Sequence, residues 1–181
     1  MGIVRSQSIN NSISFYIGML IGAINTVIIY PNTFNNHPEH FGLIQILVAY
    51  AIVVSTFTTL GVPKIFVRFF PSVKDKGQLF FLSLLTPLLG FVFALLSYFL
   101  FKEQIFDMLN ASHLLRVNFF YIILLVFFIG FYDILTAISR SFLSAASPIF
   151  INEVFLKLYS MLVLLLHWFQ YIDFSTLLQV Y

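Results

Sequence analysis

Five apolar stretches, each close to the length needed to cross a membrane, follow one another along the 181 residues of this chain. The hydrocarbon core of a bilayer takes roughly 20 apolar residues to cross as a helix. The stretches leave too few residues over for a separate soluble domain. The pattern therefore predicts an all-α fold, a polytopic bundle of membrane helices that acts at or across the membrane. The stretches cover about residues 12–30, 43–60, 79–101, 117–138 and 153–169, and a sixth begins at about residue 174.

The composition excludes a soluble globular fold. Hydrophobic residues make up 60% of the chain and charged residues 9%, whereas soluble domains carry about 25% charged residues. A soluble fold of this length could not bury so much apolar surface. The net charge of +2 gives no field that favours nucleic acid, and the absence of cysteine excludes disulfides, thiol catalysis and Cys-ligated metals.

The positions of Lys and Arg predict that the N-terminus lies in the cytoplasm, because cytoplasmic loops carry an excess of positive charge. With the N-terminus inside, only Lys102 and Arg116 lie outside. No cleavage site of small residues follows the first stretch, so we interpret it as a retained helix and not a signal peptide. The other seven cations then lie inside: Arg5, Lys64, Arg68, Lys74, Lys76, Arg140 and Lys157.

Polar side chains within the apolar stretches favour a bundle with polar inner faces over a set of simple anchors. Each such group needs a partner in lipid. The first stretch also carries a GxxxG motif, Gly18 and Gly22, which we interpret as a packing motif and not a dimerisation site. The polar residues are Asn25 and Thr26 in the first stretch, Gln45, Ser55, Thr56, Thr58 and Thr59 in the second, and Asp133 in the fourth.

Thr86–Pro87 with Gly90 predicts a break within the third stretch. Proline removes one backbone hydrogen bond and kinks a helix. Transporters use broken helices as hinges or as parts of a binding site, and kinks also occur in static bundles. The sequence leaves both interpretations open.

Lys64 and Arg68 are four residues apart and share one face of a helix, among apolar residues. Their charged ends either reach the inner headgroups from an interfacial helix or form a cationic vestibule that binds a phosphate or pyrophosphate group.

Asp133 lies roughly 24 Å along the fourth stretch from its start, at 1.5 Å per residue. A carboxylate at that depth is costly, so we expect it to face the bundle. Arg140 is seven residues further on the same face, and the two form either a structural pair or part of an ion- or proton-coupling site. Glu153 and Lys157, spaced i,i+4, predict a structural ion pair at the start of the fifth stretch.

No nucleophile–base pattern, paired carboxylates or phosphate-binding loop is present in the sequence. His37, His40 and His113 fall in loops without metal-ligand spacing. We therefore expect no enzymatic activity, no metal and no cofactor.

The stretch HPEHFGLIQILVAYAIVVSTFTTLGVPKIFVRFFP carries three features of a known family. They are the turn Pro38–Glu39–x–Phe41–Gly42, the stop at Leu60–Gly61, and the run Arg68–Phe69–Phe70–Pro71. This stretch resembles the start of bacterial polysaccharide-export flippases. That group includes the O-antigen and lipid-linked oligosaccharide translocases of the multidrug/oligosaccharidyl-lipid/polysaccharide exporter superfamily.

The resemblance implies a transporter of two lobes around a cavity that opens alternately to each side of the cell (cytoplasmic or inner) membrane. The substrate would be an undecaprenyl-pyrophosphate-linked glycan, used for cell-surface polysaccharide such as lipopolysaccharide. Arg68 matches a position where a basic residue is expected to meet the pyrophosphate, and charge position adds Lys64 and Arg140. The chain resembles most of the first lobe, so we interpret it as a fragment whose second lobe is missing. The alternative is a complete protein of this length.

Three other functions remain as alternatives. One is a multidrug/cation antiporter of the same superfamily, with Asp133 as the coupling carboxylate. Another is a non-catalytic scaffold subunit of a glycan-assembly complex. A glycan transferase or polymerase would need an acid/base constellation that the sequence lacks.

Overall fold

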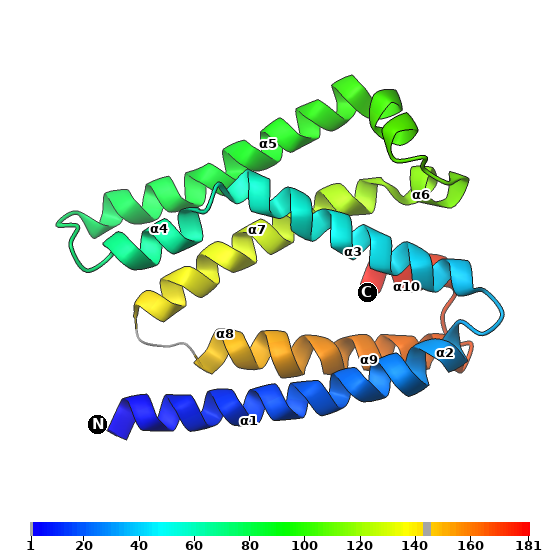
Figure 1. The fold of residues 1–181 in the computed structure, drawn as a ribbon, viewed down its shortest axis with the longest axis horizontal. Helices are drawn as coiled ribbons and strands as arrows, with labels where there is room; N and C mark the ends of the chain where they lie inside the picture. The colour runs from blue at the N-terminus through cyan, green and yellow to red at the C-terminus, as the bar shows by residue number, and fades with distance from the viewer. Residues whose placement is uncertain (1, 143–145) are drawn as a thin grey trace. The chain divides into compact units, whose positions relative to one another are not determined.

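All the regular secondary structure in the computed structural model is helical (Figure 1) over the residues it describes, 2–142 and 146–181. Side chains are described for residues 7–142 and 148–181. The prediction of an all-α chain is confirmed. Arg5, one of the cations predicted to lie inside, has its side chain outside the described set.

Five of these helices are long and apolar enough to cross a membrane, and each overlaps one predicted stretch. Such helices are those of a membrane-embedded protein. Helical structure extends past the predicted stretches at most ends, for example to Met108 in the third helix. The five helices are Gln7–Thr33, Pro38–Thr59, Lys76–Met108, Phe120–Ser141 and Pro148–Trp168.

The chain divides into two units, the first made of residues 1–44 with 144–181. Two composite helices form this unit and run side by side in the same direction (Figure 1). Its buried core joins both to the short C-terminal helix and to the start of α3 (Pro38–Thr59), through Ile29, Phe34, Ile44, Val163, Leu164 and Leu177. The first composite helix consists of α1 (Gly2–Ile24), the π-helix η1 (Asn25–Ile29) and α2 (Tyr30–Thr33). The second consists of α8 (Ala146–Phe150), the π-helix η2 (Ile151–Phe155) and α9 (Leu156–Trp168). The short C-terminal helix is α10 (Phe174–Val180).

The second unit, residues 45–143, is built around α7 (Phe120–Ser141), which packs against α4 (Val62–Phe69) and α5 (Lys76–Met108). It also holds most of α3 (Pro38–Thr59) and the short α6 (His113–Asn118). The buried face of α7 carries Ile122, Ile123, Val126, Ile134 and Ala137. An aromatic cluster closes one end of the unit and consists of Phe66, Phe70, Phe80 and Phe142.

Left-handed residues end three of the long helices. Leu60 and Gly61 follow α3 with φ of 49° and 72°, so the stop predicted at Leu60–Gly61 is present. Asn110 follows α5 with φ of 44°, and Gln170 follows α9 with φ of 62°. Such residues turn the chain sharply away from the helix axis. They set the direction in which α4, α6 and α10 leave the preceding helix.

The predicted break at Thr86–Pro87 is wrong in position. Helical backbone angles continue through Pro87, and the interruption in α5 lies at Phe101, with φ −118° and ψ 21°. Gly90 serves a different purpose: a Cβ there would overlap the carbonyl oxygen of Thr58. The small residue therefore allows backbone contact between α3 and α5. A hinge at this position was one of the two interpretations that the sequence left open.

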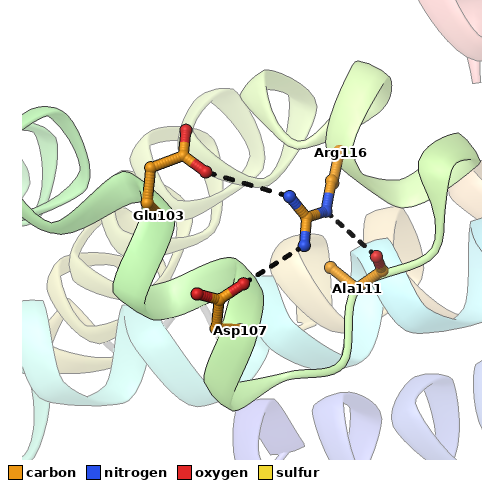
Figure 2. A network of polar contacts seen from close by, with 4 residues as sticks. All are labelled: Glu103, Asp107, Ala111 and Arg116. Carbon is orange, nitrogen blue, oxygen red and sulfur yellow. Dashed lines mark hydrogen bonds and ion pairs between the residues drawn. The ribbon is translucent and has the colours of Figure 1, made fainter.

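A polar network fixes the turn that leads from α5 to α6 (Figure 2). Arg116 donates from Nε to the carbonyl oxygen of Ala111 over 3.1 Å. Its two terminal nitrogens lie 3.4 Å from Asp107 Oδ1 and 3.8 Å from Glu103 Oε2. All three charged side chains are exposed, so the network orders the turn with a small contribution to stability.

Candidate functional site

Polar groups from α1 and η1 face those of η2 and α9 along one contact line, which we call the polar ladder. Its members come from the first and fifth apolar stretches, and the hydrogen bonds between the two helices join residues 132 to 139 positions apart in sequence. The ladder consists of Gly18, Gly22, Asn25, Glu153, Lys157 and Ser160.

Two glycines bring the helices of the ladder together. A Cβ on Gly18 would overlap the backbone carbonyl oxygen of Glu153, and one on Gly22 would lie 3.9 Å from the Lys157 side chain. The GxxxG motif therefore packs against another helix of the same chain. This agrees with its interpretation as a packing motif.

Lys157 links the two helices electrostatically. Its ammonium donates to Glu153 Oε2 over 2.7 Å and to the carbonyl oxygen of Gly18 over 3.3 Å. The Glu153 side chain is 21% exposed and that of Lys157 36% exposed. The predicted Glu153–Lys157 ion pair is present, and it also contacts the first helix. An ionised pair inside a membrane-spanning helix calls for such extra donors and acceptors.

Asn25 completes the ladder. Its Nδ2 donates to the Lys157 carbonyl over 3.1 Å and lies 3.5 Å from Ser160 Oγ. The side chain is only 4% exposed, and Oδ1 has no hydrogen-bond partner among the described residues. A buried amide oxygen without a partner is costly, so this atom marks the one incompletely satisfied point of the ladder.

Both composite helices contain a π-helical segment at the ladder, η1 beginning at Asn25 and η2 ending just before α9. A π-helix adds a residue to the turn and occurs often at functional sites. Here each segment adjusts the rotation of its helix near a polar contact. Sequence periodicity gave no signal for either segment.

The cations predicted to bind phosphate lie on α4. Phe66 is fully buried and Phe70 nearly so, while Lys64 and Arg68 project from the opposite side and are exposed. The Arg68 guanidinium lies 5.8 Å from the ring of the adjacent Phe69. Neither Lys64 nor Arg68 forms an ion pair with any described residue. This arrangement suits an interfacial helix and a vestibule equally well.

Asp133 and Arg140 lie on α7 and are both exposed. Within the described part of the chain, Asp133 has no ion pair or hydrogen bond, so the direct pair with Arg140 is not formed there. Seven residues span two helical turns, which places the two side chains on one face but about 10 Å apart along the axis. Between them, Thr136 Oγ1 is buried and has no partner in the described set.

His37, His40 and His167 belong to an aromatic region of the first unit, whereas His113 begins α6 in the second. His40 stacks on Phe174 with ring centroids 3.7 Å apart, and His167 Nδ1 lies 2.8 Å from the carbonyl oxygen of Ile172. Among the described residues, no group of three metal-ligating side chains comes together.

Comparisons of the sequence with protein-family models and with curated proteins, and of the fold with solved structures, find no match. The resemblance to polysaccharide-export flippases therefore stays a prediction. The ladder, α4 and the exposed face of α7 are the features from which a function has to be argued.

Proposed function

We propose that the chain forms the first lobe of a flippase that moves a lipid-linked oligosaccharide across the cytoplasmic membrane for cell-surface polysaccharide synthesis. The lobe spans the membrane several times with its N-terminus inside. A second lobe, supplied by the remainder of a longer protein, completes the transport cavity. The glycan is carried on an undecaprenyl pyrophosphate.

The observation that carries the proposal is the exposed polar face of α7. Asp133 is exposed within a helix long and apolar enough to cross a membrane, and Arg140 is exposed near the end of the same helix. Charged side chains facing lipid are costly and rare. An aqueous cavity between two lobes removes that cost, and simple anchors have no use for such a face.

The cationic helix α4 adds a binding group to this cavity. It packs against α7, the helix of Arg140. Arg68 presents a planar fork of donors, which binds phosphate oxygens in pairs, and Lys64 adds a point charge. This packing is compatible with pyrophosphate recognition by Arg68, which the resemblance implies, and by Lys64 and Arg140, which charge position adds.

Arg68 is tested by Arg68→Lys and Arg68→Gln in the full-length protein, with surface glycan and membrane abundance measured together. We expect export to fall for Arg68→Lys and further for Arg68→Gln at normal abundance. Lys74→Gln is the matched control, because Lys74 is also an exposed cation but lies outside α4. Wild-type export by Arg68→Gln at normal abundance would remove Arg68 from the site. A parallel loss of abundance and export would favour a topological role.

The orientation is tested separately, because the chain has no cysteine. Single cysteines at Asn35 and Gln78 are expected to react from opposite sides of the membrane, Asn35 from outside. Reaction of both with an impermeant reagent added to intact cells would contradict the proposed topology.

A cation-coupled antiporter is the second candidate, favoured by the unpaired carboxylate of Asp133. Asp133→Asn should then abolish the dependence of transport on an ion gradient, while Asp107→Asn in the Arg116 network should leave it unchanged. A flippase without ion coupling would show the same gradient dependence in both variants.

A further inference from the structure

A cavity of about 840 Å³ lies within the second unit, between one face each of α3, α5 and α7. We call it the apolar groove. Its volume is in the range of small-molecule sites. Representative lining residues are Tyr50, Val53 and Phe57 of α3, Phe93 and Ala94 of α5, and Ile122 of α7.

Thr58 and Gly90 both line the groove, and we call the part beside this closest approach of α3 and α5 its narrow end. The two helices are in backbone contact at Thr58 and Gly90 and run away from each other beyond that point (Figure 1). The Thr58 hydroxyl donates to the Ser55 carbonyl and the Thr86 hydroxyl to the Leu82 carbonyl, each over 2.9 Å. Since both hydroxyls donate within their own helices, neither has a hydrogen left for a ligand, and the neighbouring lining residues Phe57, Leu60 and Leu89 are apolar.

Unused hydroxyls gather further along the groove. Tyr50, Ser97 and Tyr98 line it, and none of their hydroxyls has a hydrogen-bond partner among the described residues. The Tyr98 ring stacks on Phe119, another lining residue, with centroids 5.2 Å apart. This part of the groove can therefore donate hydrogen bonds to ester oxygens.

A cation, Lys102, follows Tyr98 along α5. Lys102 Nζ lies 5.7 Å from the Phe106 ring, which in turn packs against Phe119 at 5.2 Å. Arg116 lies over the same ring at 5.2 Å, but Glu103 and Asp107 compensate its charge. Lys102 has no carboxylate partner in the described part of the chain, so its charge is available to an anion.

We propose that the apolar groove binds a membrane glycerophospholipid, with an acyl chain directed toward Thr58 and Gly90 and the phosphate beside Lys102. The order of the groove, from apolar surface through hydroxyls to a cation, repeats the order of acyl chain, ester and phosphate in such a lipid. A polyprenyl phosphate carries no acyl ester, so it has no counterpart to the hydroxyls of Tyr50, Ser97 and Tyr98 that line the groove. This site does not depend on the proposed transport activity.

The test uses the purified full-length protein in nanodiscs of phosphatidylglycerol containing a phosphatidylglycerol with a photoreactive group at the end of one acyl chain. After illumination, peptide mass spectrometry locates the adducts. We expect adducts concentrated on groove residues near the narrow end, such as Phe57, Leu89 and Phe93. An even distribution over all exposed apolar residues would show only bulk lipid contact and would overturn the proposal.

Three variants test whether the labelling depends on the shape and charge of the groove. Ala94→Phe fills the groove and should abolish the adducts there, while Leu82→Phe, an exposed position of the same helix outside the lining, should retain them. Lys102→Gln should weaken the labelling without changing its location. The adduct map of the unaltered protein tests the proposal by itself, so the test stands even if Ala94→Phe does not fold.

Two further measurements test whether the apolar groove binds something other than a phospholipid. A photoreactive polyprenyl phosphate that labels the groove, when the phospholipid probe does not, would overturn the phospholipid assignment in favour of a substrate tail. Cross-links between two copies of the chain at Phe93 or Ala94 would overturn it in favour of a self-association surface. Labelling of the groove by the phospholipid probe, with neither of these, supports the proposal.

Discussion

The two units both bring helices into backbone contact at a glycine, but what surrounds the contact differs. In the first unit, the helices run in the same direction from Gly18 to Asn25, and polar groups continue the contact as the ladder. In the second, α3 and α5 touch at Gly90 and then separate, leaving the apolar groove. The first arrangement holds two helices together over several turns, and the second makes room for a ligand.

The difference follows from where the polar side chains send their hydrogen bonds. Thr58 and Thr86 bond to carbonyls of their own helices, so they add nothing across the α3–α5 contact. Asn25 and Lys157 bond across to the neighbouring helix. In a membrane, burial of apolar surface does not drive helices together. Hydrogen bonds between helices, such as those of Asn25 and Lys157, therefore extend a contact that a glycine begins.

The largest expected effect is at the glycines themselves. Gly18→Ala and Gly90→Ala each place a Cβ onto a backbone carbonyl, which cannot move as a flexible side chain can. We expect each to lower the free energy of unfolding by on the order of 3 kcal/mol, measured by circular dichroism during SDS titration in mixed micelles.

Gly42→Ala is the matched control, because nothing lies within 4 Å of its Cβ position in α3. Alanine should there increase stability by up to about 1 kcal/mol through helix propensity. Equal destabilisation at all three glycines would contradict the two contact points.

The second-largest loss of stability is expected when the ion pair of the polar ladder is broken. Lys157→Met leaves the half-buried Glu153 carboxylate without its partner and removes the link to Gly18. We expect a loss of about 2 kcal/mol, with partial recovery in Lys157→Met combined with Glu153→Gln, because the second change removes the uncompensated charge. A double variant as unstable as the sum of the two single variants would show that the residues act independently.

Asn25→Leu should have a smaller effect, about 1 kcal/mol, because it removes the bond to the Lys157 carbonyl and also the unsatisfied Oδ1. Trp168 is the only tryptophan and ends α9, so its fluorescence reports on this unit. Unfolding followed at Trp168 should shift for Asn25→Leu. An unchanged midpoint would mean that the amide contributes nothing to the α1–α9 contact.

The smallest effect is expected for the exposed network of the second unit. Arg116→Gln removes two ion contacts to side chains that are 73% and 77% exposed, and such pairs contribute roughly 0–1 kcal/mol. The same measurement as for Lys157→Met gives a direct comparison of an exposed and a half-buried ion pair. A loss larger than that of Lys157→Met would reverse the proposed ranking.

Local signals in the sequence were sufficient for the existence of the five long helices and for the end of α3. Apolar runs of membrane-spanning length gave the five long helices, and Leu60–Gly61 gave the end of α3 because both residues adopt positive φ there. GxxxG indicated close packing, as Gly18 and Gly22 show.

The partners of these elements could not be predicted, since they depend on which distant helices meet. Nothing near Gly18 in the sequence points to Glu153, and nothing near Gly90 points to Thr58. The break in the third stretch was predicted at Pro87 because proline removes a backbone hydrogen bond. The backbone instead leaves helical geometry at Phe101, toward the turn that Arg116 orders. Asp133 and Arg140 share a face as predicted, but a two-turn spacing alone does not bring their charges into contact.

The pairing of the first helix with the last long one also has a consequence for biosynthesis. The ribosome makes Asn25 well over a hundred residues before Ser160, its partner. At about 5–20 residues per second, the first helix waits for roughly 7–27 seconds after it is made, with its polar amide unmatched. During that interval it has to be held by the insertion machinery, by a temporary neighbour or near the membrane surface. Truncation of the nascent chain before residue 157 should therefore leave the first helix easy to extract from the membrane, and extension past residue 165 should fix it there.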